Sequence, residues 1–389
     1  MQVINSSGEI LTLAPHPLAA GGGEGQVHKI LSPVKYKNNC VKIFYTSKRG
    51  PERENRIYFM LMNKPQELKS PTHIVCWPVD FVKNDKEFLG FVMPLADEKS
   101  ISLNFLCLPE VVGLPDAAFW NNKYTRNAPQ GFISRLKLCA NLAVAVHRIC
   151  SIGYYVLGDM KPQNVRVTHD GVIFLLDTDS IQISNDQKLL FKAGAITPDY
   201  APPEIMKCPL SATWDRFSIA VVFYQIMLGI HPFASIPVDE LGEFTSFHNN
   251  ISHGLFPYGS NKNKIKSFAS RHKSFDKIPA SLQRLFLKTF EDGLNQPELR
   301  TSIEDWGTVF YREAIKLEKA VKVNISTTHT PSPPKLVGSN SIKNKPRISI
   351  GFGNFIIWLL ILLSILMFVI VLTPGLDVQL LQWLKLINQ

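Results

Sequence analysis

Residues 156–164 read Val-Leu-Gly-Asp-Met-Lys-Pro-Gln-Asn, and residues 176–179 read Leu-Asp-Thr-Asp. One interpretation is a polar turn between a helix and a strand, because Asp, Asn and Pro are common in turns for purely local reasons. The other is chemical, because transfer of a γ-phosphoryl group needs a carboxylate at the incoming hydroxyl, a cation over the phosphate and oxygen ligands for Mg²⁺. The chain supplies these residue types in order as Asp159, Lys161, Asn164 and Asp177. The rest of the sequence favours the chemical interpretation.

The order of these four residues resembles the phosphoryl-transfer centre of the protein kinases. That family carries His-Arg-Asp, four further residues and an Asn, followed by Asp-Phe-Gly. Asp159 and Asn164 have that spacing. The resemblance implies that Asp159 accepts the hydroxyl proton and that Lys161 stabilises the phosphates. It also implies that Asn164 and Asp177 bind the Mg²⁺ ion, or Mn²⁺ in its place, that accompanies ATP.

A glycine-rich stretch, Ala-Gly-Gly-Gly-Glu-Gly-Gln-Val at residues 20–27, precedes a strand-like run that contains Lys42. Glycines allow a hairpin backbone to approach phosphates closely, and a lysine can neutralise phosphate oxygens. By the kinase resemblance, the expected nucleotide-binding residues are Gly22, Gly23, Gly25, Val27 and Lys42. Alanine stands at position 20, where the first glycine of the family pattern would fall. This change weakens one contact and leaves the motif in place.

The helix after Lys42 should supply a carboxylate that orients this lysine. Glu54 is the predicted partner, and Glu52 is the reserve. Both acids could instead simply favour the positive end of the helix, and their spacing does not separate the two roles. Met93 lies in a strand expected to enter the hinge between two lobes, where backbone groups would bind adenine. Its alternative role is that of a core methionine.

Further motifs follow in the order found in protein kinases. Apolar residues recur at three- and four-residue spacing between positions 132 and 149, which predicts an amphipathic helix leading into the Asp159 loop. Glu204, at the end of an Ala-Pro-Pro-Glu run, is expected to form a scaffold ion pair with Arg300, and Asp215 is expected to brace the catalytic loop. The resemblance covers residues 15–306. It is closest to bacterial eukaryotic-like Ser/Thr kinases with Asp-Thr-Asp, some of which are fused to helix-hairpin-helix DNA-binding segments.

Residues 355–373 carry a second strong signal, because they contain no charge over 19 positions. As a helix, such a segment is long enough to cross a hydrocarbon core of roughly 30 Å. A buried core helix normally shows a polar face, whereas only Ser364 and Thr373 interrupt the apolar surface here. Four basic residues precede the span and only Lys385 follows it. We therefore expect a single-pass protein of the cell inner membrane or plasma membrane, with its N-terminal side cytoplasmic.

The predicted fold class is α+β: a bilobed protein-kinase-like fold followed by a flexible linker and one transmembrane helix. The predicted parts are an N-lobe at 1–96, a C-lobe at 97–320, a basic flexible linker at 321–353, the transmembrane helix at 354–374 and a short tail at 375–389. The linker holds five basic residues and no acidic one, which is half of the formal net charge of +10. We therefore predict no nucleic-acid partner. The linker either contacts anionic lipid headgroups or is a solvated flank of the span.

Two departures from the kinase pattern bear on function. Leu157 and Gly158 replace the His and Arg, which argues against switching by phosphorylation of the activation loop. Thr178 and Asp179 replace the Phe and Gly, and Asp179 is expected either as a second metal ligand or, by preference, as an exposed or capping aspartate.

The favoured function is a membrane-anchored Ser/Thr protein kinase that transfers the ATP γ-phosphoryl group to protein hydroxyls. The first alternative is a catalytically weak pseudokinase that acts as a nucleotide-binding signalling scaffold. The second is a small-molecule phosphotransferase, because Gly158-Asp159 also resembles the loop of aminoglycoside kinases. The protein substrate, the activating signal and the oligomeric state cannot be named from residue spacing.

Overall fold

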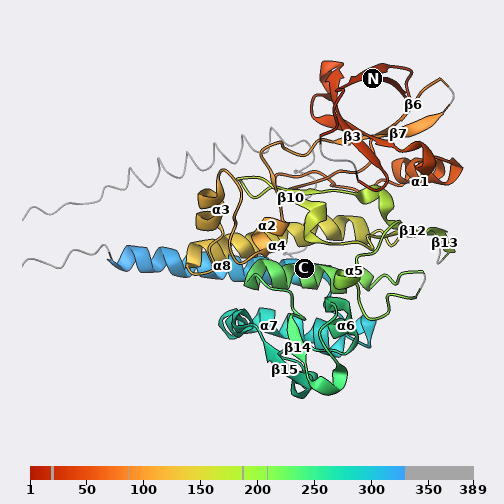
Figure 1. Cartoon of the computed structure of the whole chain (residues 1–389). Helices are drawn as coiled ribbons and strands as arrows, with labels where there is room; N and C mark the ends of the chain where they lie inside the picture. The colour runs from red at the N-terminus through yellow and green to blue at the C-terminus, as the bar shows by residue number, and fades with distance from the viewer. Residues whose placement is uncertain (19–21, 86, 186–187, 208, 329–389) are drawn as a thin grey trace, which may run out of the picture. The chain divides into compact units, whose positions relative to one another are not determined.

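The computed structural model describes residues 1–18, 22–85, 87–185, 188–207 and 209–328. A strand-rich part near the N-terminus and a larger, mainly helical part belong to one compact unit (Figure 1). The predicted transmembrane helix at 354–374 and the predicted tail lie outside the described residues. No helix within the described ranges combines the length and the apolar character needed to cross a membrane.

Six antiparallel strands close into a barrel in the order β1-β2-β3-β4-β7-β6. Their bounds are β1 Gln2–Asn5, β2 Ile10–Leu13, β3 Gly25–Ser32, β4 Asn39–Phe44, β6 Asp80–Lys83 and β7 Phe88–Pro94. Side chains alternate between the two faces of each strand, and one set, including Val3, Leu11, Val41 and Val92, fills the interior. Because closure pairs each strand on both sides, the β3–β4 hairpin is held rigidly.

α1 (Pro51–Met62) packs against β6 and β7 of the barrel. It begins with a proline at its first turn, as the sequence predicts. Ile57 and Met60 on one face of this helix are fully buried. The chain then forms β5 (His73–Val75), which runs parallel to β11 of the following part. β5 therefore belongs to a four-stranded sheet, in the order β5-β11-β10-β8, that is separate from the barrel.

The remaining elements build the helical part, which lies below the barrel in Figure 1. Its helices are α2 Asn104–Cys107, α3 Ala117–Lys123, α4 Pro129–Cys150, α5 Trp214–Leu228, α6 Phe247–Ser252, α7 Ala280–Leu287 and α8 Ile303–Thr328. Its strands are β8 Ile101–Ser102, β9 Tyr155–Val156, β10 Val165–Val167, β11 Ile173–Leu175, β12 Gln182–Asn185, β13 Lys188–Phe191, β14 Ser235–Pro237 and β15 Ile265–Phe268. α4 covers the helix predicted around 132–149 and leads into β9. The loop that carries Asp159 follows directly.

α8 lies beside α4 and corrects one predicted boundary. Residues 321–328, predicted as the start of the linker, belong to this helix. Ser302 caps its first turn by accepting a hydrogen bond from the Asp305 backbone N–H at 3.0 Å. Trp306 and Phe310 are fully buried in the helical core. Capping and burial therefore stabilise a helix whose last residues lie in the stretch predicted as linker.

Candidate active site

The β3–β4 hairpin brings the glycine-rich turn next to the lysine. Val27 of β3 lies opposite Lys42 of β4 in the antiparallel register. Gly25 lies directly against β4, because a Cβ at this position would be 2.3 Å from the carbonyl oxygen of Ile43. Only glycine avoids that collision. At Gly23, by contrast, an added Cβ would meet no atom of the described residues within 4 Å.

A cavity of about 610 Å³ is lined by this hairpin and by the Asp-Thr-Asp turn. Most of the predicted site residues line it: Gly22, Gly23, Gly25, Val27, Lys42, Met93, Asn164 and Asp177. Small-molecule and cofactor sites commonly have volumes of roughly 300–1,000 Å³. Residues distant in the sequence thus meet at one site whose volume is suitable for a nucleotide.

Lys42 is surrounded by acidic side chains. Its Nζ lies 2.8 Å from both carboxylate oxygens of Asp179, 3.1 Å from Asp177 Oδ1 and 3.9 Å from Glu24 Oε2. Burial by itself lowers the pKa of Lys42, but the carboxylates of Asp179 and Asp177 outweigh burial and raise this pKa above its usual value. Lys42 is therefore a fixed positive charge at the cavity wall.

The structure corrects the predicted partner of Lys42. Among the described residues, neither Glu54 nor Glu52 forms an ion pair with this lysine. The side of α1 that faces the site carries Arg53, which pairs with Glu24 at 2.8 Å, and the buried Arg56. Since consecutive helical residues point about 100° apart, the rotation of α1 that turns these arginines inward turns the two glutamates away.

Asp179 was also predicted incorrectly. Its side chain is 1% exposed and paired with Lys42, so it is neither an exposed nor a capping residue. The side chain of Asp177 is 43% exposed and reaches the cavity. The two aspartates of the Asp-Thr-Asp turn therefore differ in environment. Sequence reasoning missed Glu24, Arg53 and Asp179 as a group, although each lies within or next to a motif that it singled out.

Asp159 is held by residues of its own loop, and one of them, Lys161, also contacts Thr197. Lys161 Nζ lies 2.6 Å from Asp159 Oδ2 and 2.9 Å from Thr197 Oγ1. The side-chain amide of Asn164 donates to the carbonyl oxygen of Asp159 at 2.9 Å. Asp159 Oδ1 is buried and, among the described residues, has no hydrogen-bond partner. An unpaired buried acceptor is unfavourable by itself, so this oxygen is available for a hydroxyl group.

Asp215 stabilises this loop through hydrogen bonds to its backbone, as the sequence predicts. Its carboxylate accepts the backbone N–H groups of Leu157 at 2.7 Å and Gly158 at 3.0 Å. Gly158 has φ +75°, a left-handed conformation that favours glycine. Complete burial raises the pKa of Asp215 to about 6, although both N–H groups act in the opposite direction. The buried carboxylate of Asp215 therefore fixes the backbone of the two residues that precede Asp159 in the sequence.

Asn164 and Asp177 fit the predicted role of metal ligands. Asp177 adopts a left-handed conformation with φ 57° and ψ 38°, which is uncommon outside glycine and often found at functional sites. Because Asn164 uses its amide nitrogen on Asp159, its amide oxygen is left for a ligand. One carboxylate and one amide oxygen suit Mg²⁺, which usually adds phosphate and water oxygens. Binding of ATP and Mg²⁺ here remains a prediction.

The predicted scaffold ion pair between Glu204 and Arg300 is confirmed. Both guanidinium nitrogens donate to the carboxylate, at 2.6 and 2.8 Å. Arg300 is fully buried and also donates to the carbonyl oxygens of Gly293 and Leu294. This pair stabilises the helical part away from the catalytic loop.

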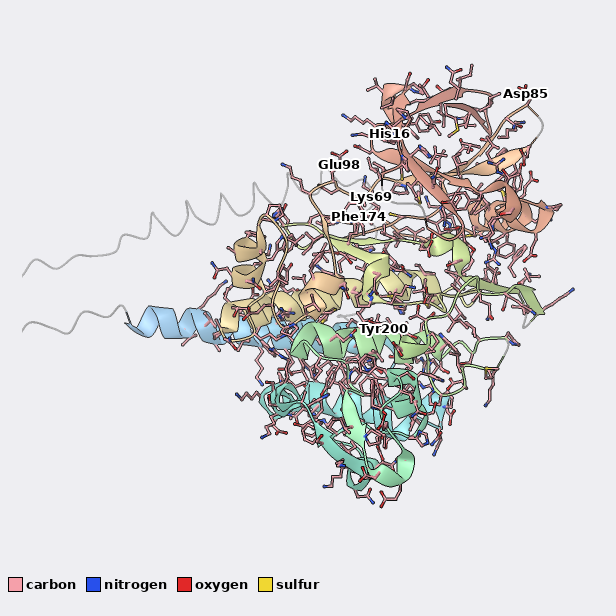
Figure 2. All side chains as sticks on the ribbon, in the orientation of Figure 1. His16, Lys69, Asp85, Glu98, Phe174 and Tyr200 are labelled. Carbon is pink, nitrogen blue, oxygen red and sulfur yellow. The ribbon has the colours of Figure 1, made fainter. Side chains whose placement is uncertain are left out.

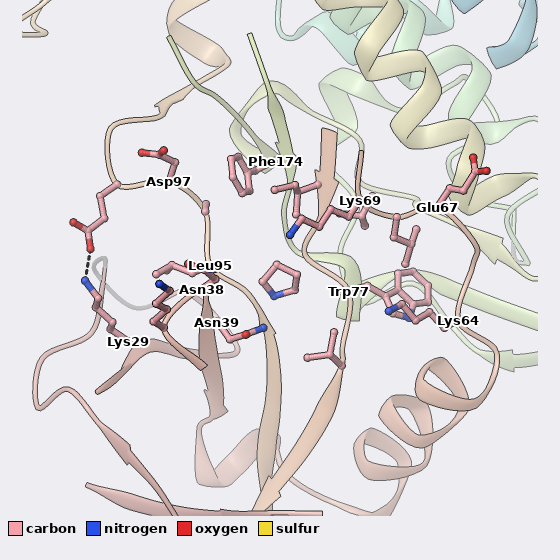
Figure 3. Close-up of a pocket in the computed structure, with 18 of the residues that line it drawn as sticks. Lys29, Asn38, Asn39, Lys64, Glu67, Lys69, Trp77, Leu95, Asp97 and Phe174 are labelled. Atoms are coloured by element: carbon pink, nitrogen blue, oxygen red, sulfur yellow. Dashed lines mark hydrogen bonds and ion pairs between the residues drawn. The ribbon is translucent and has the colours of Figure 1, made fainter. Parts of the chain in front are cut away.

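A second cavity, of about 1100 Å³, has a different lining (Figure 3). It is bordered by Trp77, Phe174 and several lysines, of which Lys29 is paired with Glu98 at 2.6 Å. Figure 2 shows Glu98 and Phe174 where the barrel meets the helical part. Lys42, Asp159 and Asp177 are not among its lining residues. The larger cavity therefore borders the nucleotide-sized cavity at residues 94–98 but is not lined by these three residues.

A barrel, a helical part and a polar site of this composition define a kinase-like class of protein. The family model described as the protein kinase domain matches residues 21–277. Because this match covers more than half of the chain, the protein belongs to the protein kinase family.

Individual relatives agree with this assignment. The chain is 23% identical over 305 residues to protein kinase YegI of Escherichia coli K12, covering 75% of this chain and 43% of YegI. It thus spans less than half the length of that relative. Citron Rho-interacting kinase of Homo sapiens is 35% identical over 103 residues, which are 24% of this chain and 5% of that protein.

A solved structure supports the fold. The ROP18 kinase domain in complex with AMP-PNP and sucrose matches with a TM-score of 0.53 at 17% identity, covering 84% of this chain and 86% of that one. The similarity to bacterial and other kinases supports the family resemblance recognised in the sequence. The relationship to Asp-Thr-Asp kinases with helix-hairpin-helix segments stays a prediction.

Proposed function

We propose that this protein is an active Ser/Thr kinase that transfers the γ-phosphoryl group of ATP to protein hydroxyls. One observation carries the proposal: in the part of the chain that the structure describes, Asp159 has a buried carboxylate oxygen without a partner, while Lys161 holds the other oxygen at 2.6 Å. A general base needs a free acceptor in a fixed position. The nucleotide-sized cavity shares Asn164 and Asp177 with the small hollow that Asp159 lines.

In this mechanism, Asp159 Oδ1 accepts the proton of the incoming hydroxyl while the hydroxyl oxygen attacks the γ-phosphorus. The bond between the γ-phosphorus and its bridging oxygen breaks, and ADP leaves. Lys161 keeps the carboxylate in position and adds positive charge beside the transferred group. Lys42 contacts the inner phosphates of the nucleotide. Mg²⁺ held by Asn164 and Asp177 would neutralise charge between the phosphates.

The test is phosphate transfer by the purified full chain in detergent, with labelled Mg·ATP and generic acceptor proteins. Replacing the general base, Asp159→Ala, should lower the rate by about 10²–10⁴-fold while Mg·ATP still raises the unfolding temperature. Phosphate on Ser and Thr, rather than Tyr, would support the proposed specificity. An unchanged rate in Asp159→Ala would contradict the role of this residue.

The same assay separates the two alternatives. Stabilisation of the wild-type chain by Mg·ATP without transfer to any acceptor would favour a nucleotide-binding scaffold. Transfer to a small hydroxylated compound and to no protein would favour a small-molecule phosphotransferase. Neither outcome is expected, because Asp159, Lys161, Asn164 and Asp177 are all present and in mutual reach.

The proposed location is the inner or plasma membrane, with one span at 355–373 and the kinase part on the cytoplasmic side. The support is the uncharged 19-residue segment and the basic residues before it. We further propose that the basic stretch within 321–353 contacts anionic lipid. Resistance of the full chain to alkaline extraction from membranes would support the anchor. Equal binding of a 329–353 peptide to neutral and anionic vesicles would contradict the lipid contact.

A further inference from the structure

The acid that faces Lys42 comes from the Asp-Thr-Asp turn and not from α1. Both oxygens of Asp179 lie 2.8 Å from Lys42 Nζ, and the Asp179 side chain is 1% exposed. Asp177 also approaches this lysine, at 3.1 Å, but its more exposed side chain lines the cavity as a predicted metal ligand. We infer that Asp179 is the positioning residue that holds Lys42 for the nucleotide phosphates. The inference rests on the proposed nucleotide-binding function of this cavity.

The positions of the charges support this assignment. Asp179 binds Lys42 through both carboxylate oxygens, whereas Asp177 makes one longer hydrogen bond to it at 3.1 Å. Without Asp179, the acidic partners of Lys42 among the described residues would be Asp177 and the more distant Glu24. Asp177 would then be drawn toward Lys42 and away from a metal ion. The closer, buried pair between Lys42 and Asp179 therefore lowers the demand of the lysine on Asp177.

α1 contributes to the same network through Arg53. The guanidinium group of Arg53 makes two hydrogen bonds to Glu24, at 2.8 and 3.1 Å, and lies 3.8 Å from Asp179 Oδ2. Glu24 stands between Gly23 and Gly25 in the glycine-rich turn. Acidic and basic groups therefore alternate through Glu24, Arg53, Asp179 and Lys42. This network joins the glycine-rich turn, α1, the Asp-Thr-Asp turn and β4.

The position of α1 is secured separately by Arg56. This buried arginine donates to the carbonyl oxygens of Ile181 and Lys192, each at 2.7 Å. A guanidinium group can satisfy several carbonyls because it has five N–H donors in one plane. α1 is thus attached to the segment after the Asp-Thr-Asp turn without an ion pair between Lys42 and a glutamate of α1. The usual acidic contact of the helix is replaced by arginine contacts.

The test compares full-chain variants for Mg·ATP affinity, measured by calorimetry, and for phosphate transfer. Asp179→Asn should weaken Mg·ATP binding at least tenfold, and the conservative Asp179→Glu should restore part of that loss. Glu110→Gln, an exposed acid of the helical part, is the matched control and should bind as the wild type does. Loss of affinity in Glu54→Gln equal to that in Asp179→Asn would return the role to α1 and overturn the inference.

Thermal unfolding identifies variants that fail to fold, and a second measurement then decides. Glu24→Gln and Arg53→Gln affect partly exposed side chains, and their double-mutant cycle should show a coupling of at least threefold in Mg·ATP affinity. Strictly independent effects would contradict the proposed network. If the wild type binds Mg·ATP but transfers no phosphate, the kinase proposal fails while the affinities still test the role of Asp179.

Discussion

The buried pair of Glu204 and Arg300 allows a stability effect to be worked out from the structure. Arg300 has a fully buried side chain, and the carboxylate of Glu204 is 10% exposed. Glu204→Gln removes the negative charge and leaves one amide oxygen for two guanidinium donors. Breaking a buried ion pair by removing one partner costs about 3–5 kcal/mol. Because one acceptor remains, we expect the lower end, about 3 kcal/mol of unfolding free energy.

The assay is urea unfolding of the purified chain, followed by tryptophan fluorescence. The matched control is Asp239→Asn, which removes an ion pair with Lys266. The side chain of Asp239 is 85% exposed and that of Lys266 is 58% exposed. Exposed pairs contribute at most about 1 kcal/mol. If Glu204→Gln lowers the free energy of unfolding no more than the control does, this pair is not desolvated and the reasoning is refuted. Phosphate transfer at a temperature where both variants are folded should remain measurable.

Three further predictions concern the site and the helical core. Gly25→Ala should lower the unfolding temperature, because the added Cβ would lie 2.3 Å from a carbonyl oxygen of β4. Gly23→Ala should not lower it, because no described atom lies within 4 Å of the added Cβ; equal effects of the two substitutions would contradict this packing. Lys161→Met should lower kcat much more than it changes the KM for ATP in steady-state kinetics. A higher KM with an unchanged kcat would show that Lys161 serves binding alone. Burial lowers the pKa of His231 to about 3. The contribution of the neutral imidazole to folding stability is therefore complete above pH 6.5 and is lost as the pH falls toward 3. Acid titration of His231→Gln should show a smaller loss of stability over that range than the wild type does.

Local motifs predicted much of the site because the chemistry restricts the residue types. Asp159, Asn164 and Asp177 were placed from their resemblance to the motifs of protein kinases, and the structure brings them together at adjoining cavities. The ion pair of Glu204 and Arg300 was also predicted from motifs almost a hundred residues apart.

The partner of Lys42 could not be predicted in the same way. Arg53 and Glu54 are neighbours in the sequence, and a helix turns each residue by about 100°. Which of them faces the site depends on the rotation of α1 about its axis, which is set by the packing of Ile57 and Met60 in the core. Spacing along the chain contains no measure of that rotation.

The sequence by itself determined that the chain carries the acids, amide and lysines of phosphoryl transfer, in the order of a protein kinase, before an uncharged segment of 19 residues. Only the tertiary structure decided that Asp179 is buried against Lys42 while the side chain of Asp177 stays 43% exposed. The physical reason is that ion pairing depends on distance and on exclusion of water. Both are properties of the packed barrel, α1 and the Asp-Thr-Asp turn together.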